Sequence, residues 1–430
     1  MSTTTLLSYQ TGDSLQQIPS YTSEPQVHEQ RLALSGRFPR PSGNFVKESK
    51  NGNARLRLMA QEDDAVLPLY SSGAPVDGVI ELSKTEGVSR VEVKLEGHLK
   101  LREIAEGGHS TARLCLDTRV LWIKDRENRI CPDTLRFSLQ IPDTFTFEEK
   151  TYPLPPTFGV KLSGLPGFTA NIDYSVGAII NRPNASGPVK SKAIGLIVGT
   201  QTVATPILYY PRTHPPSPLP HPLVTTSRGF LETPEWGVHE SVLYARQKGI
   251  NDITVKLYIP VSRVFCISER IPFHLSISSN PISLAAFLPL SPTTHVVGRP
   301  KAMRLQLMRQ STVDVRSVVK ADANREMWRV DNIGEATFRL IGDAPTWIAY
   351  SGEIHIDTSV RTAGFKAAGL SVKDCLLLSL NPFDPYKCPF SDLRQVLNVR
   401  LTTDLRSPNA ADRLPSPPYV PRPQETGSRA

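Results

Sequence analysis

The stretch Val91-Glu-Val-Lys-Leu-Glu-Gly-His-Leu-Lys-Leu-Arg102 decides the fold class. Apolar residues occupy its odd-numbered positions except Gly97, and charged residues or histidine occupy its even-numbered positions. A period of two over twelve residues predicts a half-buried β-strand with one wet face. The same alternation recurs between turn residues in shorter segments: 135–141, 172–180, 253–261, 271–277, 303–307 and 397–401. Because we find no sustained period of 3.6 residues, the pattern predicts antiparallel all-β sandwiches.

Proline sets the predicted domain organisation. It supplies 38 of the 430 residues, well above its usual share of ~5%, and such a content excludes a large helical bundle. Six prolines fall within the fourteen residues 209–222, which predicts an extended, semi-rigid linker. The predicted order is a disordered tail (1–62), a β-sandwich domain (63–206), the linker (207–235), a second β-sandwich domain (236–406) and a disordered Pro-rich tail (407–430).

The net charge is +8, from 49 Lys and Arg against 41 Asp and Glu, which is too weakly basic for a dedicated nucleic-acid-binding protein. Two segments concentrate this charge. Residues 28–58 fit either a solvated tail or a contact with an anionic membrane surface. Residues 299–329 fit a solvated strand face, an anionic lipid or phosphopeptide site, or a nucleic-acid site, of which the last lacks interleaved aromatic residues.

The sequence offers little for catalysis. It contains no Gly-x-Ser-x-Gly elbow, no Gly-x-x-x-x-Gly-Lys-Ser/Thr phosphate loop and no His-Glu-x-x-His motif. Its five cysteines are widely spaced, no secretory signal opens the chain, and no run of ~20 apolar residues occurs. We therefore expect a cytosolic, non-enzymatic protein with reduced thiols, without catalytic residues, cofactor or metal, and with no nucleic-acid partner.

Several fragments, in order, resemble the N-terminal domain of arrestins. They are Tyr70-Ser-Ser-Gly-Ala-Pro-Val-Asp-Gly-Val-Ile-Glu-Leu82, Val88-Ser-Arg-Val-Glu-Val-Lys-Leu-Glu-Gly97, Leu135-Arg-Phe-Ser-Leu-Gln-Ile141, Leu154-Pro-Pro-Thr-Phe158 and Ile172-Asp-Tyr-Ser-Val176. In the second half, Glu269-Arg-Ile-Pro-Phe-His-Leu-Ser-Ile277 resembles the strand that opens an arrestin C-terminal domain. The layout is most similar to that of fungal α-arrestins. This resemblance implies two immunoglobulin-like, arrestin-type antiparallel β-sandwiches joined by the Pro-rich linker.

The resemblance also implies adaptor work. The α-arrestins bind the cytoplasmic parts of membrane transporters or receptors and recruit a HECT-type ubiquitin ligase, whose WW domains bind Pro-Pro-x-Tyr motifs. This chain has no complete motif of that kind; the nearest match is Ser416-Pro417-Pro418-Tyr419. The predicted ligase contacts are thus Pro417, Pro418 and Tyr419. Contact with an anionic membrane or phosphorylated cargo is predicted for Arg299, Lys301, Arg304, Arg309, Arg316 and Lys320.

The expected location is the cytoplasm, at the periphery of the plasma membrane or of endosomes. Two other functions stay open. A retromer-like sorting or coat component would share the arrestin fold and bind partner subunits without recruiting a ligase. An enzyme built on β-sandwiches would need a site that the sequence does not reveal.

Overall fold

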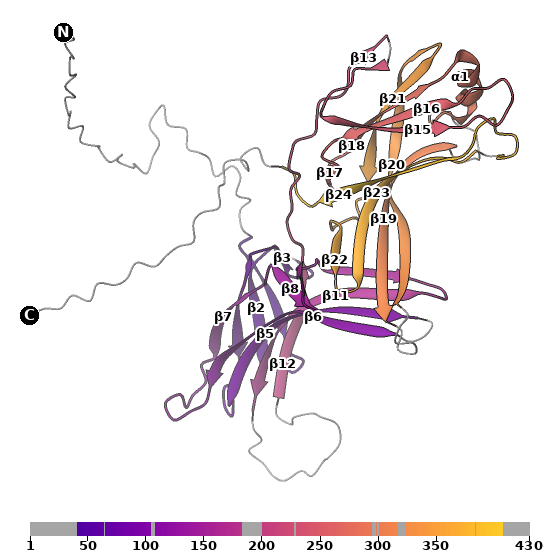
Figure 1. Cartoon of the computed structure of the whole chain (residues 1–430). Coiled ribbons are helices and arrows are strands. Elements are labelled where there is room, and N and C mark those ends of the chain that lie inside the picture. Colours follow the sequence, from indigo (N-terminus) through magenta and orange to yellow (C-terminus); the bar gives the residue numbers. More distant parts are fainter. Residues whose placement is uncertain are drawn as a thin grey trace, which may run out of the picture. The chain divides into compact units, whose positions relative to one another are not determined.

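The structure, a computed structural model, is built almost entirely from β-strands (Figure 1). It describes residues 41–63, 65–104, 108–182, 200–227, 229–294, 298, 301–316, 324–382 and 384–406. The predicted all-β sandwich class is confirmed, and so is each of the strands predicted from a period of two. Residues 1–40 of the predicted N-terminal tail and the whole predicted C-terminal tail (407–430) lie outside the described residues.

Two sheets form the first half of the fold. One has the order β1-β2-β4-β7, and the other has the order β3-β12-β11-β5-β6, with β10 also pairing with β11. The first sheet contains β1 (Gly43–Glu48), β2 (Ala54–Gln61), β4 (Pro75–Leu82) and β7 (Thr134–Gln140). The second contains β3 (Leu69–Tyr70), β5 (Arg90–Glu103), β6 (His109–Ile123), β10 (Phe158–Leu162), β11 (Phe168–Asn181) and β12 (Thr200–Tyr209). A separate hairpin joins β8 (Thr144–Phe147) and β9 (Lys150–Pro153).

The stretch that sets the fold class lies in β5, and its one irregular position has a steric cause. The odd-numbered side chains of β5 are buried and the even-numbered ones point outward. A Cβ at Gly97 would meet ring atoms of Tyr174 at 2.5 Å and the Sγ of Cys115 at 2.9 Å. The Tyr174 ring fills this space, and its hydroxyl donates a hydrogen bond to the carbonyl of Pro155 (2.6 Å). Glycine therefore replaces an apolar residue where the neighbouring ring needs the room.

Most strands of the second half belong to one long sheet. Its order is β15-β16-β18-β21-β20-β19-β23-β24-β17, with β22 pairing with β23. These strands are β15 (Trp236–Leu243), β16 (Ile253–Pro260), β17 (Val264–Cys266), β18 (Ile271–Ser278), β19 (Met303–Arg316), β20 (Asn324–Ala344), β21 (Trp347–Ile356), β22 (Phe365–Ala367), β23 (Leu370–Leu380) and β24 (Leu393–Thr402). Inward residues from both ends of this order pack into one hydrophobic core, so the sheet folds over its own interior.

The hydrophobic cores follow the two halves of the chain with one exception. The first core is built mainly from residues 54–209, and the second from residues 243–401. The first core also takes in five residues of the second half: Val313, Met327, Ala367, Ala368 and Leu370. The described residues accordingly belong to one compact unit, and the division into two domains stays a prediction.

The prediction of a disordered N-terminal tail is wrong for residues 43–48 and 54–61, which form β1 and β2. Leu56 and Leu58 are fully buried in the first core. The alternate residues point away from it: Arg55 pairs with Glu48 (2.8 Å), and Arg57 pairs with Glu81 (2.7 Å). Two cations of the basic segment 28–58 are thus bound within the fold. The alternation of apolar and charged residues over 54–58 is short, and the polar residues around it make the whole region resemble a tail.

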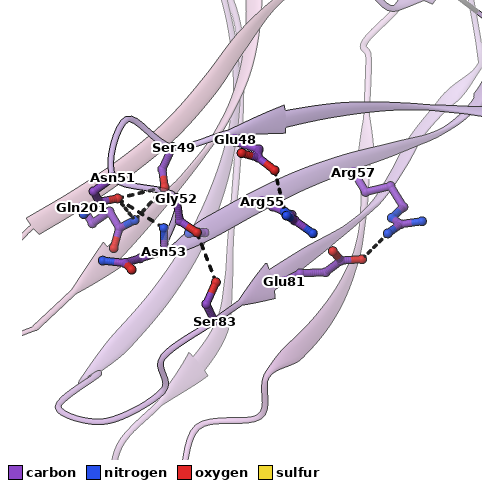
Figure 2. Close-up of polar contacts among 11 residues, drawn as sticks. Glu48, Ser49, Asn51, Gly52, Asn53, Arg55, Arg57, Glu81, Ser83 and Gln201 are labelled. Atoms are coloured by element: carbon purple, nitrogen blue, oxygen red, sulfur yellow. Dashed lines mark hydrogen bonds and ion pairs between the residues drawn. The ribbon is translucent and has the colours of Figure 1, made fainter.

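The turn between β1 and β2 is tied to β12 (Figure 2). The side-chain amide of Gln201 donates to the Oγ of Ser49 (2.9 Å) and to the Oδ1 of Asn51 (2.8 Å). Ser49 Oγ in turn accepts the backbone N–H of Ala54 (3.0 Å), which starts β2. Side chains of the turn therefore satisfy backbone groups that a free tail would leave to water.

The Pro-rich segment 211–222 contains no strand and no helix. It is followed by β13 (Thr225–Thr226) and β14 (Gly229–Phe230), which lie inside the predicted linker. The segment is held against the second half, since Trp236 Nε1 donates to the carbonyl of His221 (2.9 Å) and the N–H of Leu223 donates to His274 Nε2 (3.1 Å). Because Nε2 accepts, the proton sits on Nδ1 and is donated to the Oγ of Ser351 (2.5 Å).

A short helix interrupts the strands where the sequence predicted none. The helix α1 (Pro281–Phe287) runs into the 3-10 turn η1 (Leu288–Leu290). The Asn280 side chain caps α1 by accepting the N–H of Ser283 (2.7 Å), and Pro281 occupies the first turn. At seven residues α1 is too short to display a helical period in the sequence.

Candidate functional site

A cavity of about 740 Å³ lies in the described part of the chain. Its walls come from β9, the end of β12, the segment after β12, β22 and the neighbouring strands β23 and β24. Tyr152, Tyr209, Tyr210, Pro211 and Phe365 give it a largely aromatic and apolar lining. Its volume lies in the range of ligand pockets, about 300–1,000 Å³.

Five cations surround this cavity: Arg212, Arg361, Lys366, Lys373 and Arg400. All five side chains are exposed. Within the described residues, none of them forms an ion pair or a side-chain hydrogen bond. We call these five residues the basic rim.

Two carboxylates also line the cavity, and only one of them offsets the basic rim. Asp143 is exposed, but Asp374 is buried and already bound by Arg309. The guanidinium of Arg309 donates from Nε to Asp374 Oδ1 (2.7 Å) and from Nη2 to Oδ2 (3.0 Å). The pair is neutral, so the field in the cavity is set by five positive charges and one negative charge. Such a site attracts anions.

The buried Arg309–Asp374 pair also holds the loop that carries part of the basic rim. Arg309 on β19 lies directly opposite Asp374 on β23. Its Nη2 donates a further hydrogen bond to the carbonyl of Thr362 (2.9 Å). This bond fixes the backbone beside Arg361. Three residues later, the Phe365 ring packs edge-on against Phe158 with centroids 5.2 Å apart, which anchors the other end of the loop.

The opposite wall is held by backbone and hydroxyl contacts. The N–H of Tyr210 donates to the carbonyl of Tyr70 (3.0 Å), and the N–H of Thr213 donates to Thr403 Oγ1 (2.8 Å). Tyr209 is buried, which raises the pKa of its hydroxyl, so the phenol stays neutral and can only donate or accept hydrogen bonds. The Ser371 hydroxyl lines the same cavity, is buried, and has no hydrogen-bond partner among the described residues.

The geometry suits a ligand that is partly apolar and partly anionic. A ligand with an apolar part and one or more negative charges would bury the apolar part against the tyrosines and prolines and place its charge at the basic rim. Among the described residues, no three His, Cys, Asp or Glu side chains are arranged to hold a metal ion. Burial raises the pKa of the Cys115 thiol to about 12, and burial also raises the pKa of Cys131 and of Cys375, which keeps these thiols protonated.

The six basic residues predicted to contact a membrane or phosphorylated cargo do not form one free patch. Arg304 forms a bidentate ion pair with Glu335, in which Nε donates to Oε1 and Nη2 donates to Oε2, both at 2.9 Å. Arg309 is buried in the pair with Asp374, so it does not offer its charge to a surface and differs from the prediction. Lys301 is half-buried just before β19, and Arg316 ends that strand.

The other predicted site residues lie outside the described residues. These are Arg299 and Lys320 in the basic segment, and Pro417, Pro418 and Tyr419 in the tail. The ligase contact therefore stays a prediction. The sequence interpretation also missed the whole basic rim, because its members are isolated in the sequence. One available signal was Asp374, which occupies an apolar phase in the alternating stretch 370–380.

None of the helices in the described part of the chain is long and apolar enough to cross a membrane. No known family model matches the chain, and no curated protein is significantly similar to it.

Proposed function

We propose that this protein is a non-enzymatic, arrestin-like adaptor that binds acidic or phosphorylated segments in the cytoplasmic parts of membrane transporters or receptors. One observation carries the proposal: five unpaired cations converge on an aromatic cavity of about 740 Å³. A cavity with this charge and lining suits an extended peptide that combines negative charge with an apolar side chain.

The rest of the proposal draws on the sequence resemblance. The adaptor would act in the cytoplasm at the plasma membrane or at endosomes and would promote ubiquitin-linked endocytosis of its cargo. The Ser416–Tyr419 segment would supply the contact with the WW domains of a HECT-type ligase. Further basic residues would hold the protein near anionic lipid, at about 1 kcal/mol for each Lys or Arg close to the membrane.

The cavity is tested by peptide binding to the full-length chain, measured by fluorescence anisotropy. The probes are an extended peptide with alternating Asp and Leu or Tyr residues, the same peptide with phosphoserine in place of Asp, and a neutral peptide with Asn in place of Asp. We expect the two anionic peptides to bind and the neutral one to bind much more weakly. Affinity should fall as salt rises, because exposed charges are screened within about 8 Å at 0.15 M.

The matched variants are Arg361→Ala/Lys366→Ala in the basic rim and Lys124→Ala/Arg126→Ala, two exposed cations outside the cavity. Loss of two rim cations should weaken anionic peptides about 5- to 30-fold, since each contact is worth roughly 0.5–1 kcal/mol. The control pair should leave affinity unchanged. Equal effects of both pairs would show that only net charge matters and would remove the cavity as the site.

In cells, the proposal predicts that surface levels of particular transporters rise when the protein is deleted. The wild-type chain should restore their removal, and the Arg361→Ala/Lys366→Ala variant should not. If deletion changes no plasma-membrane protein, the adaptor function is wrong even where peptides bind in vitro.

A further inference from the structure

Strand β6 is the outermost strand of its sheet, after the order β3-β12-β11-β5-β6. It pairs with β5 along one side, and the described residues provide no strand on its other side. Irregularities in the ladder bracket the segment 115–120, which is regular between them. The segment therefore presents unpaired backbone groups of the kind that template pairing with another strand.

The side chains of this segment are unusual for an edge that faces water. Leu116 is 46% exposed and Val120 is 44% exposed, and they lie on the same face of the strand. Asp117 and Arg119 share the opposite face. Their mutual contact within one chain is loose, at 4.0 Å from Arg119 Nε to Asp117 Oδ2, and the same oxygen accepts the N–H of Gln140 (3.1 Å).

We propose that β6 pairs antiparallel with β6 of a second copy of this chain, around a two-fold axis at Thr118. A two-fold axis perpendicular to the joined sheet keeps each side chain on its own face, so one residue must lie opposite its own copy. With Thr118 at the axis, Leu116 lies opposite Val120 of the partner subunit. Asp117 then lies opposite Arg119 of the partner subunit, and the symmetric pair forms as well.

Charge selects this register from its neighbours. An axis at Asp117 would set two carboxylates opposite each other, and an axis at Arg119 would set two guanidinium groups opposite each other. Like charges directly opposite destabilise a strand pair. An axis at Leu116 would place Arg119 opposite Arg113 of the partner subunit. Only the axis at Thr118 joins opposite charges and also covers both exposed apolar residues.

This inference does not depend on the proposed function, because β6 contributes no residue to the lining of the cavity. A dimer of this kind carries two cavities. If the cavities bind segments of clustered membrane proteins, the second binding event becomes intramolecular, and the apparent affinity rises without a new contact. The short regular segment makes a small interface, so we expect weak association, on the order of 10 µM.

Cysteine crosslinking of the full-length chain tests both the pairing and its register. In the proposed dimer the two Thr118 Cα atoms are about 4.5–5.5 Å apart, which lies within the disulfide range of about 4.4–6.8 Å. Thr118→Cys should form a disulfide-linked dimer under mild oxidation. Thr111→Cys is an exposed threonine on the same strand, and its two copies would be on the order of 45 Å apart. It should give no more dimer than the wild type, which sets the baseline for the five native cysteines.

Charge variants give a second, independent readout by sedimentation velocity at rising protein concentration. Arg119→Asp and Asp117→Arg should each reduce self-association at least tenfold, and a mixture of the two variants should restore a heterodimer. Thermal unfolding of each variant reports whether it folds. Any of three results would overturn the proposal. The wild type could stay monomeric at assay concentrations up to about 100 µM, or both cysteine variants could crosslink equally. The charge variants could also associate as strongly as the wild type.

Discussion

Removing one partner of the buried Arg309–Asp374 pair is expected to destabilise the fold strongly. The two side chains are 9% and 1% exposed, so neither charge has water to replace its partner. In Asp374→Ala the guanidinium loses two hydrogen bonds and keeps only the one to the carbonyl of Thr362. In Arg309→Met the carboxylate and that carbonyl both lose their donor. Breaking a buried pair in this way costs about 3–5 kcal/mol.

The double variant Arg309→Met/Asp374→Leu separates charge from packing. It leaves no buried charge, and replacing a buried ion pair by apolar side chains of similar volume is often neutral or stabilising by about 1–4 kcal/mol. We therefore expect it to be at least about 3 kcal/mol more stable than the sum of the single changes. Urea denaturation of the full chain, followed by circular dichroism and by tryptophan fluorescence, measures all four free energies of unfolding.

The same variants test the link from the pair to the cavity. The double variant lacks the donor to Thr362, so the loop with Arg361 should loosen and anionic peptides should bind several-fold more weakly although the fold is stable. Two results would refute the reasoning, because either would mean that the pair is already solvated. The single variants could each lose less than about 1 kcal/mol of the free energy of unfolding. The double variant could lose the full sum of the two single losses.

Three further predictions concern other parts of the chain. Burial lowers the pKa of His274 to about 4 from an ordinary 6.5, so the folded state binds fewer protons there than the unfolded state. The contribution of His274 to the free energy of unfolding should be fully present above pH 6.5 and fall by up to about 3 kcal/mol as pH drops toward 4. His274→Gln should flatten this part of the pH profile of the free energy of unfolding in urea. A profile unchanged by this substitution would contradict the assignment. Leu56→Ala should cost about 2–5 kcal/mol, because Leu56 is fully buried, whereas a melting temperature like that of the wild type would mean that β2 is peripheral. Tyr419→Ala in the full chain should abolish capture by WW domains; a stable stoichiometric complex with partner subunits that ignores this change would favour the retromer-like alternative.

The strands could be predicted because their evidence is local. The odd-numbered residues of 91–101 are buried as their period requires, and the shorter alternating segments gave β7, β11, β16, β18, β19 and β24. The segment 54–58 carries the same signal over five residues, but polar neighbours lower its average hydrophobicity, so the composition of the region predicts a tail. Helix α1 could not be found because about two helical turns show no measurable period.

Most of the candidate site could not be predicted from the sequence, because its residues are far apart along the chain. The basic rim is scattered from Arg212 to Arg400, and only the pairing of β23 with β24 and the loop before β22 bring its members to one cavity. No pattern in a single segment reports which distant strands will be neighbours. The predicted basic segment 299–329 had the charge but not the arrangement, because two of its arginines pair with carboxylates on neighbouring strands.

One signal of the site was nevertheless present in the sequence. Arg309 continues the buried phase of Met303, Leu305 and Leu307 on β19, and Asp374 interrupts a run of buried apolar positions on β23. A charge at a position that the alternation assigns to the core needs an opposite charge in reach, since an unpaired buried ion is too costly to keep. Two such residues of opposite sign on two strands therefore predict that these strands lie side by side in register. That inference fixes β19 against β23, and with it the wall of the cavity that carries Lys373 and the loop of Arg361.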